Sequence, residues 1–124
     1  MTVQTELSDH FEKELRRLHR KFPSILSEVE ILVDQLERGE LPGDKIPNIG
    51  YNVYKVRLRN PSAGRGKRGG FRAIYYVRHT SFVVLITIYF KSDQTDIHKE
   101  RLQALIQQYK ASQRGSADPN KNRE

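Results

Sequence analysis

The residues of this chain best suited to chemistry are lysines and arginines that alternate with apolar residues in short runs. Lys55 and Arg57 lie in the run Tyr54-Lys-Val-Arg-Leu58, and Arg72 lies in the run Phe71-Arg-Ala-Ile-Tyr-Tyr-Val77. In a strand, alternate side chains point to the same face, which would place Lys55 and Arg57 about 7 Å apart. Cations fixed on a sheet suit a polyanion, most naturally a phosphodiester chain.

The middle of the chain carries no acidic residue that could neutralise these cations. Between Lys45 and Ser92 the sequence holds ten Lys or Arg and no Asp or Glu, whereas the rest of the chain holds twelve basic and fifteen acidic residues. Ordinary protein surfaces mix charges of both signs. The sequence therefore favours a nucleic-acid-binding face over the alternative, a solvated basic surface without a partner.

A glycine-rich loop, Gly64-Arg-Gly-Lys-Arg-Gly-Gly70, joins the two runs. It lacks the order of glycine, lysine and serine or threonine that defines a nucleotide-binding P-loop, and no helix is predicted after it. The candidate RNA contacts are the basic residues of this loop and two residues of the flanking strands: Arg59, Arg65, Lys67, Arg68 and Tyr76. The alternative for the loop is a simple hairpin turn without a ligand.

Metal-dependent and cysteine-based chemistry have no support in the sequence. The histidines are scattered without ligand spacing (His10, His19, His79 and His98), and the predicted strands contain no carboxylate. The chain has no cysteine, and therefore no disulfide, thiolate metal site or cysteine nucleophile. We expect a site that works without a metal or another cofactor.

The chain is expected to work in the cytoplasm. Its longest apolar stretch, 82–90, has the length of a strand, well short of the roughly 18 residues that suggest a membrane span. The polar residues after Met1 do not resemble a signal peptide. The lack of cysteine fits a reducing compartment.

The periodicity of apolar residues predicts the elements that hold the cationic runs in place. Helices are predicted over 9–21, with Asp9 and Glu12 as a capping box, and over 25–38, with Ser24 as the cap. After a loop over 39–50, strands are predicted over 52–58, 71–77 and 83–89, with a short edge strand before Ser8. A third helix is predicted over 96–110.

The predicted fold class is α+β: an N-terminal αα-hairpin packed on a small, twisted, mostly antiparallel sheet, with a C-terminal helix. The chain of 124 residues suits one domain, which we place at 1–111. Residues 112–124 lack an apolar period and are predicted to form a disordered tail. The face of the sheet opposite the hairpin would present Lys55, Arg57, Arg72 and Lys91.

Three motifs, in this order, resemble the RelE branch of the RelE/ParE toxin superfamily: Tyr54-Lys-Val-Arg-Leu58, Gly69-Gly-Phe-Arg-Ala-Ile-Tyr-Tyr76 and Leu85-Ile-Thr-Ile-Tyr-Phe-Lys91. The order of the predicted elements fits as well, and the resemblance spans roughly Phe11 to Ile106. It implies a type II toxin that cuts messenger RNA on the ribosome and is held inactive by a cognate antitoxin. In such toxins the RNA 2′-hydroxyl attacks the adjacent phosphate without a metal.

The resemblance also implies a catalytic set. Lys55 matches the catalytic lysine of RelE-like toxins, Arg57 matches a second cation, and Arg72 matches the arginine that stabilises the phosphate. Where the family has an arginine just after the last strand, this chain has Lys91 followed by Ser92, and His98 takes the position of a late tyrosine. A lysine at the first place can contribute charge, and an imidazole at the second can act as an acid or a base near pH 7.

Two other functions stay open at this stage. A ParE-like protein resembles this fold but poisons DNA gyrase, a role that does not need the combination of Lys55, Arg57 and Arg72. A non-catalytic RNA- or ribosome-binding module would use the same cationic face without cleaving RNA.

Overall fold

The computed structural model describes residues 3–61, 70–94 and 96–114. In chain order its elements are β1 (Gln4–Leu7), α1 (Asp9–Lys21), α2 (Ile25–Glu37), β2 (Asp44–Lys45), β3 (Val53–Leu58), β4 (Phe71–His79), β5 (Phe82–Phe90) and α3 (Lys99–Arg114). Arg65, Lys67 and Arg68 of the glycine-rich loop lie outside the described residues, so their RNA contacts stay predictions.

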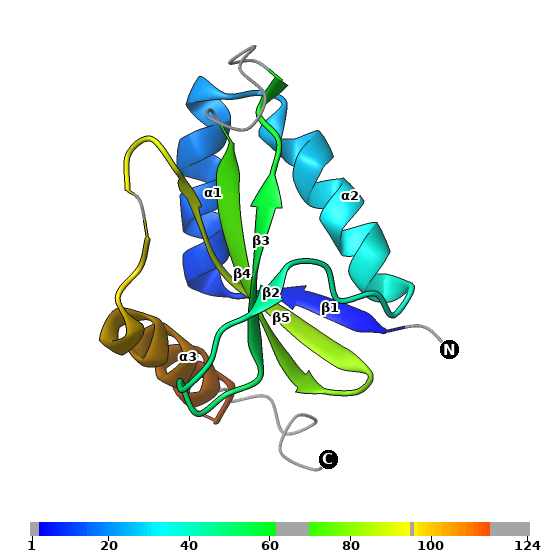
Figure 1. Ribbon diagram of the computed structural model, residues 1–124, viewed down its shortest axis with the longest axis vertical. Coiled ribbons are helices and arrows are strands. Elements are labelled where there is room, and N and C mark those ends of the chain that lie inside the picture. Colours follow the sequence, from blue (N-terminus) through cyan, green and yellow to red (C-terminus); the bar gives the residue numbers. More distant parts are fainter. Residues whose placement is uncertain (1–2, 62–69, 95, 115–124) are drawn as a thin grey trace.

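The strands form one sheet in the order β1-β5-β4-β3-β2 (Figure 1). β1 runs parallel to β5, and the other neighbouring strands are antiparallel. The predicted α+β class is confirmed, with two N-terminal helices, a mostly antiparallel sheet and a C-terminal helix. The predicted edge strand before Ser8 is also confirmed as β1.

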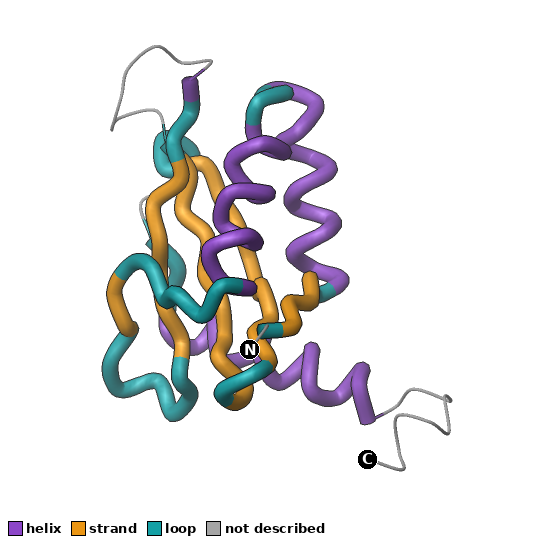
Figure 2. The backbone as a smooth tube through the Cα atoms, turned by 90° about the vertical axis from the view of Figure 1, so that its right-hand side faces the viewer, coloured by secondary structure: helices purple, strands orange, loops and turns teal. Residues whose placement is uncertain are grey.

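The helical hairpin, α1 and α2, lies side by side against one face of the sheet (Figure 2). Its apolar stripes supply fully buried side chains, among them Phe11, Leu18, Ile25 and Leu32. The predicted cap at Asp9 is wrong, because Ser8 precedes the helix and its Oγ accepts a hydrogen bond from the Phe11 amide at 3.1 Å. The same hydroxyl donates to the Ile86 carbonyl at 3.1 Å and so ties the start of α1 to β5.

The opposite face of the sheet is divided between a second core and an open region. α3 covers part of it with Leu102, Leu105, Ile106 and Tyr109, which pack against the sheet around Ile74. The sequence placed cations on this face but did not assign the C-terminal helix to it. The apolar periodicity of both α3 and the inward residues of β4 and β5 requires this coverage, since neither surface could stay in water at low cost. The cations lie on the part of this sheet face that α3 does not cover.

Two element boundaries differ from the sequence prediction. The predicted loop over 39–50 contains β2, whose residues Asp44 and Lys45 pair with Lys55 and Tyr54. The third helix begins at Lys99 rather than near residue 96, since the His98 carbonyl is the first to accept a helical bond, from the Leu102 amide at 3.0 Å. It also continues to Arg114, past the predicted start of the tail at 112. In the described ranges, no helix is long and apolar enough to cross a membrane.

Candidate functional site

Arg57, Arg72 and Tyr89 form a row across the three central strands of the sheet. Arg57 on β3 lies directly opposite Arg72 on β4, and Arg72 lies directly opposite Tyr89 on β5. Directly opposite residues of antiparallel strands point to the same face, with Cβ atoms about 4.5–5.5 Å apart. The three side chains, called the cationic row below, therefore meet on the face opposite the helical hairpin.

The cationic row holds two positive charges side by side. None of the salt bridges found among the described residues involves Arg57 or Arg72. Burial, and next the charge of Arg57, lowers the pKa of Arg72. Like charges directly opposite one another destabilise a sheet, whereas an anion between two guanidinium groups would form charge-assisted hydrogen bonds with both. The row can therefore bind an anion between its two guanidinium groups.

Tyr89 brings an uncharged hydroxyl to the end of the row. Its side chain is almost fully buried, with 4% exposure. Burial, together with the nearby carboxylate of Asp96, raises the pKa of Tyr89 to about 12, although the charge of Arg72 acts in the opposite direction. The phenol is therefore protonated at neutral pH, and it donates a hydrogen bond to Asp96 Oδ1 at 3.5 Å.

Lys55 stands beside the row and is held by a carboxylate from outside the sheet. Its Nζ lies 3.3 Å from Oδ1 of Asp96, which belongs to the connection between β5 and α3. The same oxygen accepts the amide of Ile97 at 2.8 Å. Burial opposes the ionisation of Asp96, but the bonds from Ile97, Lys55 and Tyr89 outweigh it and lower the pKa of Asp96. One carboxylate oxygen thus links Lys55 to Tyr89.

The structure does not bring Lys91 or His98 into these contacts. Lys91 follows β5 directly, where its amide bonds to the Gly70 carbonyl at 3.1 Å, and its side chain is half-buried. His98 is exposed immediately before α3. Both lie at the ends of the connection that carries Asp96, so they border the site without contacting the cationic row in this structure.

The two candidate RNA contacts within the described chain have different positions. Arg59 is exposed just after β3, two residues beyond Arg57. Tyr76 is 7% exposed and belongs to the core under α3. Its ring meets that of Tyr51 edge-on at 5.6 Å between centroids, and Lys110 of α3 lies over it. A base could not stack on Tyr76 without displacing this packing.

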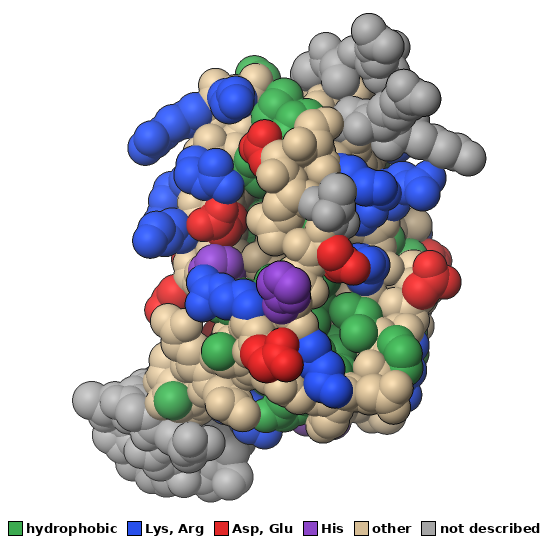
Figure 3. Space-filling model, turned by 60° about the vertical axis from the view of Figure 1, so that its left-hand side comes forward, with side chains coloured by type: hydrophobic (Ala, Val, Ile, Leu, Met, Phe, Trp, Pro, Cys, Tyr) green, Lys and Arg blue, Asp and Glu red, His purple; other side chains and the backbone are tan. Residues whose placement is uncertain are grey.

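The flank that carries α1, the connection after β5 and α3 mixes charges of both signs. Figure 3 shows basic side chains along both sides of this view, with acidic and histidine side chains between them. Asp96 is one of the acidic residues that the fold brings toward the basic segment of the sequence, and Asp44, which pairs with Lys55, is another. The segment from Lys45 to Ser92 contains no acidic residue, but acidic residues from outside it lie beside its cations, so the cationic face is partly neutralised.

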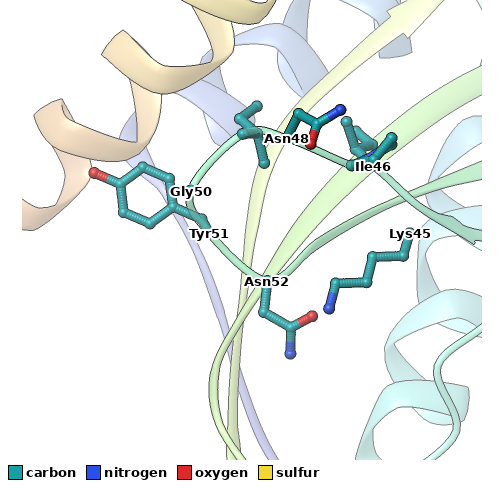
Figure 4. Close-up of a pocket in the computed structure, with 8 residues that line it drawn as sticks. Lys45, Ile46, Asn48, Gly50, Tyr51 and Asn52 are labelled. Carbon is teal, nitrogen blue, oxygen red and sulfur yellow. The ribbon is translucent and has the colours of Figure 1, made fainter.

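The loop before β3 encloses a separate hollow of about 530 Å³, lined by residues 45–52. In Figure 4 the side chains of Lys45 and Asn52 lie on one side of this loop, while the ring of Tyr51 turns away toward the helix at the left. Tyr51 packs edge-on against Tyr76 and under Lys110. The hollow therefore lies at the α3 end of the sheet, apart from the cationic row.

A metal centre finds no support in the described part of the chain, where no three His, Cys, Asp or Glu side chains gather closely enough to hold an ion. The chemical groups that the described residues bring together at the site are the cations, the phenol of Tyr89 and the carboxylate of Asp96.

Sequence reasoning missed Tyr89 and Asp96. Tyr89 was predicted only as the last residue of the strand over 83–89, and the pairing register places it opposite Arg72. Asp96 was assigned to the start of the third helix. A signal was present, since a short polar stretch without an apolar period separates Asp96 from Lys91. Without the register, this stretch could not be placed next to Lys55.

The fold and site define a small α+β protein with a cationic row on the open part of its sheet. The family model described as "RelE toxin of RelE / RelB toxin-antitoxin system" matches residues 11–118. Since the match covers most of the chain, this protein belongs to the RelE toxin family. Membership implies a cognate antitoxin as a partner. No curated protein matches the chain.

Proposed function

We propose that this protein is a ribosome-dependent endonuclease that cleaves messenger RNA without a metal and so inhibits translation. The observation that carries the proposal is the cationic row: Arg57 and Arg72 lie face to face on adjacent strands without a salt-bridge partner in the described chain. A phosphodiester is the anion that such a pair, held on a rigid sheet, is best suited to receive. Membership of the RelE family supports this choice over a ParE-like gyrase poison.

In the proposed reaction the RNA 2′-oxygen attacks the adjacent phosphorus and the bond from phosphorus to the 5′-oxygen breaks. The products are a 2′,3′-cyclic phosphate and a 5′-hydroxyl. Negative charge builds up on the phosphorane oxygens as the reaction proceeds, and Arg72 stabilises it with its planar pair of donors while Arg57 adds a second charge. The phenol of Tyr89 supplies a further donor from the end of the same row.

Lys55 is the proposed acceptor of the 2′-hydroxyl proton. In this structure its ammonium donates to Asp96, and an ammonium group has no lone pair to accept a proton. We therefore infer that Lys55 acts after it has lost a proton and separated from Asp96.

The remaining candidates act at the border of the site. Lys91 is proposed to contribute charge to the phosphate, and His98 to donate the proton that the departing 5′-oxygen needs. Either role requires the connection after β5 to move toward the row when RNA binds. Arg59 and the loop residues Arg65, Lys67 and Arg68 are proposed to hold the RNA backbone.

The cognate antitoxin is proposed to cover the cationic row with an acidic segment. The same charges that attract RNA would attract such a segment, and its binding would weaken as salt rises. The toxin acts on translating ribosomes, so we place its activity in the cytoplasm.

The test is cleavage of a defined messenger by purified protein, with and without programmed ribosomes. We expect cuts only in ribosome-bound RNA, persistence of cleavage in excess chelator at conditions that keep ribosomes assembled, and a 2′,3′-cyclic or 3′-phosphate end. A 3′-hydroxyl end that disappears with chelator would contradict the 2′-hydroxyl mechanism. Ribosome binding without any cleavage would show a non-catalytic binding module, and trapped gyrase complexes with intact messages would show a gyrase poison.

A further inference from the structure

Tyr75 is a buried residue of β4 whose hydroxyl reaches across β3 to the loop before β2. Its ring is fully buried in the core under the helical hairpin. It stacks on the ring of Tyr54, which lies directly opposite on β3, with 5.4 Å between the ring centroids and 5° between the planes. Its hydroxyl donates a hydrogen bond of 2.5 Å to the carbonyl of Pro42, 33 positions earlier in the chain. Tyr75 therefore fastens the loop before β2 to β4.

The loop that Tyr75 holds lies directly against the backbone of Lys55. Gly43 follows Pro42, and a Cβ at Gly43 would overlap the carbonyl oxygen of Lys55. The next residue, Asp44, begins β2 and pairs directly opposite Lys55. The backbone beside Lys55 is therefore placed within two residues of the carbonyl that Tyr75 binds.

The strand β2 is too short to hold its own position firmly. It consists of two residues, whereas strands usually have about 3–10. Before it, the Tyr75 hydroxyl binds the Pro42 carbonyl. After it, the Ile46 amide donates to the Val53 carbonyl at 2.8 Å. Because so few bonds flank this strand, loss of the Tyr75 bond would loosen β2 where it runs beside Lys55.

Tyr75 is also adjacent to the partner of Lys55 on the other side of β3. That partner is Ile74 of β4, the residue immediately before Tyr75. The register of β4 against β5 shifts between Ile74 and Tyr75, and such irregularities often occur next to active sites, where they redirect a side chain. The two sheet neighbours of Lys55, Asp44 and Ile74, are thus connected by way of Tyr75.

We propose that Tyr75 is a positioning residue for Lys55. By tying the loop before β2 to β4, it fixes the backbone on both sides of Lys55 and so keeps this side chain beside the cationic row. Tyr75 lies on the hairpin side of the sheet, away from RNA bound on the row. A reacting group misplaced by about 1 Å can cost about 10²-fold in rate, so the role should appear in the rate of cleavage and not in affinity. The proposal rests on the proposed function, because it takes Lys55 as the proton acceptor.

Amide hydrogen exchange of the full chain tests, without RNA, whether Tyr75 holds β2 in place. Tyr75→Phe removes the hydroxyl and keeps the ring that stacks on Tyr54. We expect exchange of the Ile46 amide to become about fivefold faster, the scale of one lost hydrogen bond. The matched control is Tyr109→Phe, which removes a phenol bond of 2.7 Å to Glu6, between α3 and β1, and should leave exchange at Ile46 unchanged. Unchanged exchange in Tyr75→Phe, or equal acceleration in both variants, would overturn the proposal.

Single-turnover cleavage on programmed ribosomes tests the consequence for Lys55. Tyr75→Phe should lower the rate at saturating protein by about tenfold, through a less well placed Lys55, while ribosome affinity stays at the wild-type value. Tyr109→Phe should leave both the rate and the affinity near wild type, although it also loses a phenol bond. Faster exchange at Ile46 with a wild-type cleavage rate would show a bond that serves stability alone, and would overturn the positioning role. If the wild-type protein cuts no RNA, the proposed function fails, while the exchange at Ile46 still decides whether Tyr75 holds β2 against Lys55.

Discussion

The Lys55 ammonium lies 3.3 Å from the carboxylate of Asp96, across 41 positions of sequence. The contact joins the strand that carries the proposed proton acceptor to the connection that leads into α3. Its partners are 33% and 64% exposed, and exposed ion pairs contribute only about 0.2–1 kcal/mol. A pair this weak does not hold the fold together, but it can be broken at low cost when an RNA phosphate arrives.

Asp96→Asn should therefore change the pH dependence of cleavage. If Lys55 accepts a proton, it first has to separate from Asp96, and the substitution removes that ion-pair partner. We expect the rise of the single-turnover cleavage rate with pH to move to lower pH in this variant. The measurement is a pH profile on programmed ribosomes at saturating protein.

Asp93→Asn is the control for this experiment. It removes the same charge from the same connection, and it keeps the backbone bond that the Asp93 amide donates to the Phe90 carbonyl at 3.0 Å. Its profile should match that of the wild type. Identical shifts in both variants would indicate a general effect of net charge, and no shift in either would argue against Lys55 as the proton acceptor.

Asp96→Asn should also have a small effect on the stability of the fold, and this effect should depend on pH. The pKa of Asp96 is lowered in the folded protein, so its contribution is present above the ordinary aspartate value of 3.8 and is lost as the pH falls through the folded value. Asp96→Asn should lower the free energy of unfolding at pH 7 by about 0.2–1 kcal/mol. The difference should shrink as the pH falls below 3.8 and vanish once the pH is below the folded pKa of Asp96, which urea unfolding at pH 7 and in the acid range would show.

The fold was predictable from the sequence because its signals are local. Apolar spacing in α1 and α2, and alternation in β3 and β4, are properties of neighbouring residues, and the structure confirms these elements within a few positions. The cap at Ser8 was not predicted, because Asp9 is an equally good cap by residue type. The structure distinguishes the two through the bonds of Ser8 Oγ to the Phe11 amide and the Ile86 carbonyl. β2 was not predicted, because a strand of two residues is too short to show an alternation of apolar and polar residues.

The site was only partly predictable because its geometry depends on register. Lys55, Arg57 and Arg72 could be selected by charge and alternation, and the pairing of Arg57 with Arg72 shows why they share a face. Tyr89 joins them through the pairing of β4 with β5, whose register shifts between Ile74 and Tyr75 and again between Val77 and His79. A sequence pattern cannot locate such a shift, so the residue opposite Arg72 could not be named in advance.

Gly43 controls the position of Lys55 through the backbone. Its φ is +91°, and a Cβ there would overlap the carbonyl group of Lys55. Gly43→Ala should therefore destabilise the protein by more than the roughly 1 kcal/mol expected from a positive φ alone, and should disturb the pairing of β2 with β3. Gly39→Ala is the matched control, since Gly39 has the same φ of +91° but nothing within 4 Å of the added atom. Equal losses of stability in urea unfolding would show that the close approach to Lys55 does not matter.

Arg72→Ala should separate catalysis from binding. Removing one fixed donor to a developing oxyanion typically costs about 10²- to 10³-fold in rate, so single-turnover cleavage should fall by this amount while ribosome affinity hardly changes. The fold should persist, because the variant also removes the repulsion between Arg57 and Arg72 on neighbouring strands. Circular dichroism and thermal unfolding check this point.

Lys67→Ala in the glycine-rich loop should do the reverse of Arg72→Ala. It removes one predicted phosphate contact, so ribosome association should weaken modestly and its salt dependence should become less steep. Cleavage at saturation should stay near the wild-type rate, because Lys67 is assigned no role in the reaction itself. If both variants lose affinity alike and the rate at saturation is unchanged in each, Arg72 belongs to a binding surface, and its assignment to phosphorane stabilisation fails.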